Sequence, residues 1–307
     1  MRIVFMGTPR FAAVSLEHLL RAKKEVSLVV SQPDRERGRG RRIEQTATKK
    51  VALEQGVDVA QPHSPNSSEF LESLRQIAPD LLVVVSYGHI LKPALLDLPS
   101  AGCVNLHPSL LPKYRGAAPI EWAVIEGEKR TGITTIFMNE KMDAGEMIEQ
   151  VTVDIGEEET AGELRERLAV KGAELLLSTV GLIERGEAKN IPQDDTQATY
   201  APKIQPEVCR IDWSENHQRI ARLIRGLSPS PGAYSFFRGK RMRLLRAVPS
   251  LETSTATEGE LLTTERLLVR AEGGWVWLKE LQPEGKKPIS DIDFINGYHP
   301  VAHEKME

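Results

Sequence analysis

The stretch MRIVFMGTPRFAAVSLEHLL, residues 1–20, joins a short apolar run to an amphipathic segment through a Gly-Thr-Pro turn. Similar apolar runs recur at residues 26–30 and 81–85. Short apolar runs of this kind are typical of parallel strands that are covered on both faces. Helical periodicity follows the first run over residues 11–23 and precedes the third over residues 70–77. This alternation predicts an α/β fold, a doubly wound and mostly parallel sheet whose site lies at the carboxyl ends of its strands.

A longer helix is predicted after residue 160. Thr160 and Glu163 have the spacing of a capping box, and leucines at helical spacing continue to a stop at Gly186. The next segment, residues 190–207, is polar and punctuated by proline, which is typical of a linker between domains.

The last third of the chain has a different pattern. One short helix is expected near residues 215–225, followed by short alternating strands that glycine-rich or proline-rich turns separate. A small C-terminal β-barrel, similar to an OB-fold, fits this pattern best. The predicted organisation is a catalytic domain over residues 1–189, a linker over 190–207 and a barrel domain over 208–307.

Composition narrows the class of protein. The chain has 307 residues, and no apolar run approaches the ~20 residues that cross a bilayer. The N-terminus enters a strand without a signal pattern, so we expect a soluble cytoplasmic protein. A monomer is expected as well. Cys103 and Cys209 are far apart in the sequence, so neither a disulfide framework nor a metal site is predicted.

Charge is distributed unevenly along the chain. Residues 35–50 contain seven basic and two acidic side chains, a net charge of +5, and residues 203–246 contain ten basic and three acidic, a net charge of +7. Because the whole chain carries −3, the remainder carries −15. Two positive patches on an acidic protein suit a polyanion that touches two surfaces, although a solvated charged face would explain either patch alone.

The run NLHPSLLPKYRGAAP, residues 105–119, holds the candidate chemistry. If it begins as a strand, Asn105 and His107 share one face, and Pro108 ends the strand directly after them. An amide N–H can stabilise an oxyanion, and a protonated imidazole can stabilise the same charge or supply a proton. Asp143, in a glycine-flanked turn, is the candidate carboxylate that would keep His107 cationic. Spacing alone leaves open that these residues are ordinary hydrogen-bonding groups at a strand end.

Other candidate sites are weaker. Cys103 is expected to be a buried thiol rather than a nucleophile. The sequence has no G-x-S-x-G elbow, and the first turn lacks G-x-G-x-x-G, which argues against a serine hydrolase and a nicotinamide site. His299 and His303 have a helical metal spacing, but Pro300 between them favours a surface location. Trp275 and Trp277 are expected to pack in a core rather than stack on bases.

A family resemblance adds to this interpretation. The run from NLHPSLLPKYRG to KMDAGEMI resembles the signature of the folate-dependent formyltransferases, with Asn105, His107 and Asp143 as its triad. The stretches SQPDRERGRGRR, VVVSYGHILKPALL, ATYAPKI, RIDWSEN and LSPSPGAY extend the resemblance over nearly the whole chain, to the branch of this family that acts on methionyl-tRNA. It implies a formyltransferase-type Rossmann-like domain followed by the barrel.

The resemblance implies direct transfer of a formyl group from 10-formyltetrahydrofolate to the α-amino group of methionine on initiator tRNA, without a metal or an enzyme-bound acyl group. Asn105 would stabilise the oxyanion, His107 would assist as a cation, and Asp143 would orient His107 and help to move the amine's proton through water. The residues implied for the folate pocket are Ser109, Leu110, Leu111 and Pro112 on one wall and Tyr87, Gly88, Ile90 and Leu91 on another.

The same resemblance gives the two basic regions a partner. Arg39, Arg41 and Arg42 would enter the acceptor stem of the tRNA, while Lys203 and the basic barrel would contact the stem from another side. Three alternatives stay open: a formyltransferase that acts on an amino sugar or another small amine, a non-catalytic RNA-binding module, and a dehydrogenase.

Overall fold

The computed structural model describes residues 1–37, 42–252, 255–301 and 303–307. These residues form two compact units, which interleave along the chain. The first comprises Met1–Gly116, Gly132–Val153 and Arg165–Tyr200, and the second comprises Ala117–Thr131, Asp154–Leu164 and Ala201–Glu307. The domain boundaries expected at residues 189 and 208 remain a prediction.

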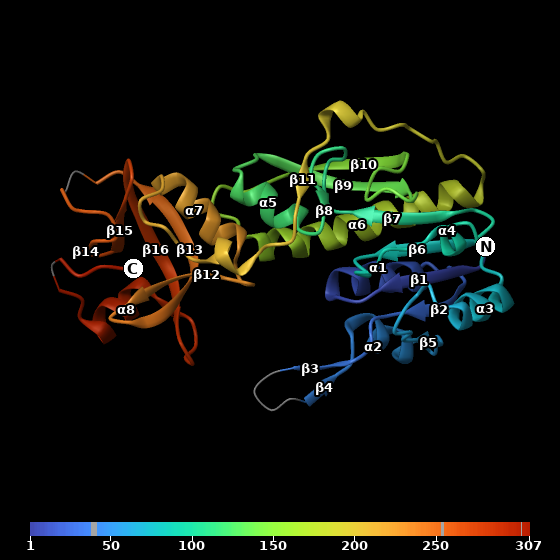
Figure 1. Cartoon of the computed structure of the whole chain (residues 1–307), viewed down its shortest axis with the longest axis horizontal. Coiled ribbons are helices and arrows are strands. Elements are labelled where there is room, and N and C mark those ends of the chain that lie inside the picture. Colours follow the sequence, from blue (N-terminus) through green and yellow to red (C-terminus); the bar gives the residue numbers. More distant parts are fainter. Residues whose placement is uncertain (38–41, 253–254, 302) are drawn as a thin grey trace. The chain divides into compact units, whose positions relative to one another are not determined.

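A seven-stranded sheet organises the first unit (Figure 1). Its strand order is β10-β9-β7-β6-β1-β2-β5, and the pairs from β7 to β5 are parallel, whereas β9 runs antiparallel to β7. The strands are β1 (Ile3–Gly7), β2 (Val26–Val30), β5 (Val59–Ala60), β6 (Leu81–Val85), β7 (Cys103–His107), β9 (Arg130–Phe137) and β10 (Met147–Asp154). The expectation of a mostly parallel α/β sheet is confirmed.

The central strands are buried on both faces, as their apolar runs predict. All five residues of β1 and of β6 are buried. Val4 and Met6 share a core with Phe70 and Leu74 of α3 (Ser68–Ile77), and since side chains alternate along a strand, Ile3 and Phe5 are buried on the opposite face. The other helices of this part of the chain are α1 (Arg10–Arg21), α2 (Ala47–Glu54), α4 (Pro93–Leu96) and α6 (Ala161–Glu184).

Local signals set the ends of these helices. The predicted capping box precedes α6, where Thr160 Oγ1 accepts from the backbone N–H of Glu163 at 3.3 Å and a Glu163 carboxylate oxygen accepts from the backbone N–H of Thr160 at 2.9 Å. Gly186 follows the helix with φ +68°, a conformation that glycine adopts without strain. Among the described residues, no helix is both long and apolar enough to cross a bilayer.

The order of the strands identifies where a ligand site is expected. After β1 the chain forms β2 and β5 on one side, and it then returns to form β6 on the other side of β1. An open α/β sheet binds ligands beyond the carboxyl ends of the strands at such a switch point. A short antiparallel hairpin, β3 (Arg35–Arg37) and β4 (Arg42–Glu44), leaves the sheet between β2 and α2.

The second unit is built on an antiparallel sheet with the order β12-β13-β16-β15-β14. Its strands are β12 (Ala233–Phe237), β13 (Lys240–Ser250), β14 (Leu261–Thr263), β15 (Leu267–Ala271), β16 (Gly274–Pro283) and β17 (Ile289–Ser290), which pairs with β16. Helices α5 (Pro119–Ile125), α7 (His217–Gly226) and α8 (Asp291–Tyr298) accompany them, and α5 and α7 contact each other.

The last described residues close this sheet into a barrel. Phe236 of β12 exchanges two backbone hydrogen bonds with Glu307, each 2.9 Å long. The backbone N–H of Met306 donates to Gly259 at 2.8 Å, and that of Leu261 in β14 donates to Glu304 at 2.8 Å. Residues 304–307 therefore join the two edge strands of the sheet, and the expected small β-barrel is confirmed. Met306 itself is buried in the barrel core.

Candidate active site

The site lies at the carboxyl end of β7. Asn105 is half-buried and His107 is buried, with 4% of its surface exposed. Leu106 points the other way and packs close to Gly172 of α6. The strand thus presents Asn105 and His107 on one face, as the sequence predicts.

Both nitrogen atoms of the His107 ring face oxygen atoms. Nε2 donates to the backbone carbonyl of Tyr114 at 2.9 Å, and Nδ1 lies 3.6 Å from Oδ1 of Asp143. A neutral imidazole has one N–H and can satisfy one acceptor, whereas an imidazolium has two. The surroundings of the ring therefore suit a cation.

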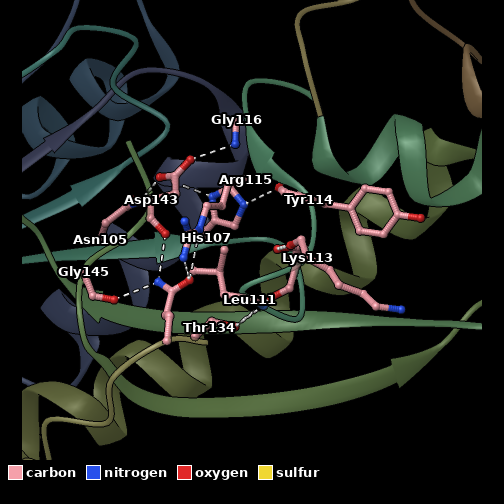
Figure 2. A network of polar contacts seen from close by, with 12 residues as sticks. Asn105, His107, Leu111, Lys113, Tyr114, Arg115, Gly116, Thr134, Asp143 and Gly145 are labelled. Carbon is pink, nitrogen blue, oxygen red and sulfur yellow. Dashed lines mark hydrogen bonds and ion pairs between the residues drawn. The ribbon is translucent and has the colours of Figure 1, made fainter. Parts of the chain in front are cut away.

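Asp143 contacts both Asn105 and His107. Its Oδ1 accepts from Nδ2 of Asn105 at 3.3 Å, and its Oδ2 accepts from the backbone N–H of Gly116 at 2.9 Å. Asp143 has φ +51°, in the left-handed region that non-glycine residues rarely adopt. Figure 2 shows the three side chains converging from β7 and from the turn that follows β9. The structure thus brings Asn105, His107 and Asp143 together, although they span 39 positions of the sequence.

A second layer of contacts surrounds this triad. Nε2 of Gln193 donates to the backbone carbonyls of Asp143 and Gly145 at 2.8 and 2.7 Å. Its Oε1 accepts from Nε and Nη2 of Arg115 at 3.1 and 2.7 Å, and Nη2 of Arg115 also donates to Asp195 at 2.7 Å. Thr199 completes the layer, because its Oγ1 and its carbonyl accept from the backbone N–H groups of Tyr114 and Arg115, both at 2.9 Å.

Sequence reasoning missed this layer. Gln193 and Thr199 lie in the segment interpreted as a linker, where a polar residue resembles its neighbours. Arg115 offered only a weak signal, since it stands in a mixed run beside Lys113 and Tyr114, and an arginine is rarely buried unless it is paired. No local pattern pairs Arg115 with Gln193, which lies 78 positions away.

The expected folate residues fall into two groups. Ser109, Leu110, Leu111 and Pro112 form a tightly held loop: Ser109 Oγ donates to the Lys113 carbonyl at 2.6 Å, and Thr134 Oγ1 donates to the Ser109 carbonyl at 2.7 Å. Gln150 Nε2 donates to the Leu111 carbonyl at 3.1 Å.

In the second group, Tyr87 and Leu91 are buried in the core, whereas Ile90 is 83% exposed. Burial raises the pKa of the Tyr87 hydroxyl to about 12. Tyr87 and Gly88 line a cavity of about 920 Å³, which adjoins the switch point of the sheet. Within the described part of the chain, residues 109–112 do not line this cavity, so the two walls are not gathered around it. Its other lining residues include Thr8, Arg10, Gln32, Thr46, Lys50 and His89.

The structure describes only some of the residues that are expected to contact tRNA. Arg39 and Arg41 lie outside the described residues, and Arg42 is placed by its backbone at the start of β4. Lys203 is exposed. Arg210 and Arg241 are also exposed, and their guanidinium groups stack over the rings of Phe236 and Tyr234, at 5.7 and 3.8 Å from the ring centroids.

The structure shows where the weaker candidate sites of the sequence lie. Cys103 is a buried thiol whose pKa burial raises to about 12. Trp275 is fully buried, whereas Trp277 is half-buried beneath Arg266 and Lys279. His299 and His303 are exposed. The described residues contain no group of three or more His, Cys, Asp or Glu side chains that could hold a metal ion.

Comparison with known proteins shows the class of this protein. The model of the formyl transferase family matches residues 1–180, and the model of the formyl transferase C-terminal domain matches residues 203–299. The two matched segments define a formyltransferase with its C-terminal domain.

Relatives that align over nearly the whole chain show to which branch of the formyltransferases this protein belongs. A methionyl-tRNA formyltransferase of Moorella thermoacetica is 44% identical over 306 residues, which cover 99% of this chain and 98% of that protein. A methionyl-tRNA formyltransferase of Syntrophus aciditrophicus is 44% identical over 298 residues and covers 96% of both chains. This chain therefore belongs to the methionyl-tRNA formyltransferase family.

Solved structures share the fold at lower identity. HypX from Aquifex aeolicus, in complex with tetrahydrofolic acid, superposes with a TM-score of 0.68 at 20% identity, over 99% of this chain and 48% of that one. The sugar 3N-formyltransferase WlaRD, with dTDP and 5-N-formyl-THF, has a TM-score of 0.68 at 17% identity, over 94% and 99% of the two chains. At these identities the likeness concerns the fold.

Proposed function

We propose that this protein transfers the formyl group of 10-formyltetrahydrofolate to the α-amino group of methionine on initiator methionyl-tRNA, with Asn105, His107 and Asp143 as its catalytic residues. The convergence of these three side chains at the carboxyl end of β7 carries the proposal. The identity to methionyl-tRNA formyltransferases over nearly the whole chain supports the choice of substrates.

The reaction passes an acyl carbon from one nitrogen to another. As the methionine amine attacks, the formyl oxygen gains negative charge, and the folate nitrogen must then leave with a proton. Asn105 suits the first need: Nδ2 carries two hydrogens, and since one points to Asp143, the other is available to the developing oxyanion. No side chain has to act as a nucleophile.

His107 supports the same charge as a cation. Its Nε2 is occupied by the Tyr114 carbonyl and its Nδ1 faces Asp143, so the ring is fixed in place. A fixed positive charge in a buried site stabilises a nearby oxyanion more than it would in water, because the local dielectric is lower.

Asp143 has two roles in this proposal. It orients His107 through the 3.6 Å ion pair, and through an ordered water it accepts the proton that the attacking amine loses and passes it toward the leaving nitrogen. Its hydrogen bonds from Asn105 and Gly116 keep the carboxylate directed at the site.

The folate is proposed to bind against two segments. The loop of Ser109, Leu110, Leu111 and Pro112 is held rigid by Thr134 and Gln150, so it can offer a preformed wall. Tyr87, Gly88, Ile90 and Leu91 would provide the second wall, in which the exposed Ile90 offers apolar surface. The bound folate supplies the formyl carbon and the leaving nitrogen.

The tRNA is proposed to contact both units. Arg39, Arg41 and Arg42 would contact the acceptor stem, and Lys203 would contact its backbone. On the barrel, the exposed Arg210 and Arg241 support a role in RNA binding, because stacked arginine and aromatic side chains suit nucleic acid. We propose that the protein works as a cytoplasmic monomer.

The test supplies purified protein with formyl-labelled 10-formyltetrahydrofolate and either initiator methionyl-tRNA or an amino-sugar nucleotide. Label on the methionine of the tRNA is the expected result. Label on the sugar alone would contradict the acceptor, and binding of tRNA without any transfer would identify an RNA-binding module. Affinity for tRNA should fall steeply with salt, since several phosphates release counterions on binding.

A further inference from the structure

Both hydrogens and the oxygen of the Gln193 side-chain amide take part in hydrogen bonds. Its NH2 group donates to the carbonyls of Asp143 and Gly145, and its Oε1 accepts two hydrogen bonds from Arg115. A guanidinium only donates and a backbone carbonyl only accepts, so this chemistry permits one orientation of the amide. Gln193 therefore connects the turn of Asp143 to Arg115 in a single defined geometry.

Arg115 is a rigid anchor for this amide. Its side chain is buried, with 4% of the residue exposed, and its planar guanidinium contacts Gln193 through two nitrogen atoms. The backbone around it is fixed as well, because Thr199 accepts hydrogen bonds from Tyr114 and Arg115. The next residue, Gly116, donates to the Asp143 carboxylate.

The turn of Asp143 needs such support. Asp143 holds a left-handed conformation, which a non-glycine residue keeps only where its surroundings impose it. Gln193 binds the carbonyl of Asp143 itself and that of Gly145, on the two sides of Ala144. Figure 2 shows Gly145 and Asp143 on this turn, with Arg115 beside them.

We propose that Gln193, anchored by Arg115, is a positioning residue that holds the Asp143 carboxylate against His107 and Asn105. It acts through the backbone of Asp143 and does not touch the substrates. The proposal rests on the catalytic role proposed for Asp143.

The first test is Gln193→Ala. A misplacement of about 1 Å at a catalytic group can lower a rate about 100-fold, so we expect kcat to fall by ~10–100-fold. KM for the folate and for tRNA should stay within about twofold, because the variant leaves in place the contacts that bind the ground state and the transition state equally. Gln197→Ala is the matched control: Gln197 is exposed, contacts Asp194 and should leave all parameters unchanged. A normal kcat in Gln193→Ala, or a loss only in KM, would overturn the proposal.

The second test is a double-mutant cycle with Asp143→Ala. If Gln193 acts through the Asp143 carboxylate, Gln193→Ala should lower single-turnover rates no further, within about twofold, once that carboxylate is gone. If instead the rate losses of the two single variants multiply in the double variant, Gln193 has a merely structural role. Full activity of Asp143→Ala would instead refute the proposed catalytic role, so the two failures are distinguishable.

Gln193→Glu separates the two arms of the amide and guards against a folding defect in the alanine variant. The carboxylate keeps the contact to Arg115 but removes both donors and repels the carbonyls of Asp143 and Gly145. We expect a loss of kcat comparable to that of Gln193→Ala, and a thermal midpoint no lower than that of Gln193→Ala, because the carboxylate keeps its partner Arg115. Wild-type kcat in this variant would overturn the proposal.

Discussion

His107 and Asp143 face each other across 3.6 Å between Nδ1 and Oδ1, while the opposite nitrogen of the same ring is fixed by a backbone carbonyl. This separation is longer than a hydrogen bond and short enough for an ion pair. Catalytic contacts are often long before substrate binds and tighten in the complex. The pair is therefore held close to a working geometry.

Replacing the carboxylate tests this pair. Asp143→Asn keeps the shape of the side chain but removes the charge that favours the His107 cation and the group that accepts a proton. We expect kcat to fall by ~10²–10³-fold, the range for removing one preorganised electrostatic interaction, with tRNA affinity nearly unchanged. Steady-state kinetics and filter binding measure the two. Asp154→Asn, an exposed residue paired with Arg130, is the control, and near-normal turnover of Asp143→Asn would refute the assigned role.

Asn105→Ala removes the proposed oxyanion donor. Because this hydrogen bond strengthens only as the carbonyl becomes tetrahedral, kcat and kcat/KM should fall together, by ~10²-fold or more. Initial rates across a range of folate concentrations give both parameters. A variant that raises KM alone would assign Asn105 to ground-state binding instead.

Arg39, Arg41 and Arg42 should matter for the binding of tRNA rather than for the chemical step. In the triple variant with Arg39, Arg41 and Arg42 each replaced by Ala, KM for tRNA should rise. The slope of log affinity against log salt should become shallower by up to about three units, because each arginine would neutralise one phosphate of the tRNA backbone.

Lys203→Ala should have a smaller effect of the same kind, and Lys171→Ala on α6, paired with Glu174, is the control. An unchanged salt slope in the triple variant would reject Arg39, Arg41 and Arg42 as RNA-binding residues.

Closure of the barrel should depend on Met306. This side chain is 2% exposed and packs in the core of the second unit, so Met306→Ala should cost about 2–5 kcal/mol of its stability. Calorimetry or thermal circular dichroism would show the loss as a lower unfolding midpoint. Lys305→Ala, at the exposed neighbouring position, keeps the same backbone pairing and should leave the midpoint unchanged. Equal midpoints for the two variants would contradict the contribution assigned to Met306.

Two buried acidic groups, the Cys103 thiol and the Tyr87 hydroxyl, should lower the stability of the first unit at alkaline pH. Burial raises the pKa of Cys103 from 9.0 to about 12 and that of Tyr87 from 10.0 to about 12. In that window the unfolded chain loses these protons first, so it binds fewer protons than the native state and stability falls as pH rises. Urea unfolding between pH 8 and pH 11 measures the slope.

Tyr87→Phe separates the contribution of one of these groups. It should reduce the slope and should not destabilise the protein at neutral pH, since no described residue bonds the Tyr87 hydroxyl. An unchanged slope in this variant would contradict the contribution of Tyr87.

Periodicity predicted the elements whose structure depends on local sequence. Strands β1 and β6 coincide with uninterrupted apolar runs because they are covered on both faces, and β2 coincides with a run that only Ser27 interrupts. Helix α6 begins at its capping box because that signal lies within one turn. The pair of Asn105 and His107 was visible for the same reason, as a two-residue spacing at a strand end.

Long-range contacts could not be predicted in this way. The segment 190–207 has the composition of a linker, yet Gln193 and Thr199 support the catalytic turn, because a polar side chain carries no mark of its distant partner. Likewise, α5 follows the catalytic run in sequence but joins the second unit through α7. The family resemblance supplied Asp143, which spacing alone offered only as a candidate.

The barrel's dependence on residues 304–307 has a consequence for biosynthesis. A ribosome makes this segment after every strand that it joins, so β12 and β14 leave the exit tunnel with unpaired edges. Until Met306 docks, those edges are open to other nascent chains or chaperones. The second unit of the enzyme thus becomes complete only after all of its strands have been translated.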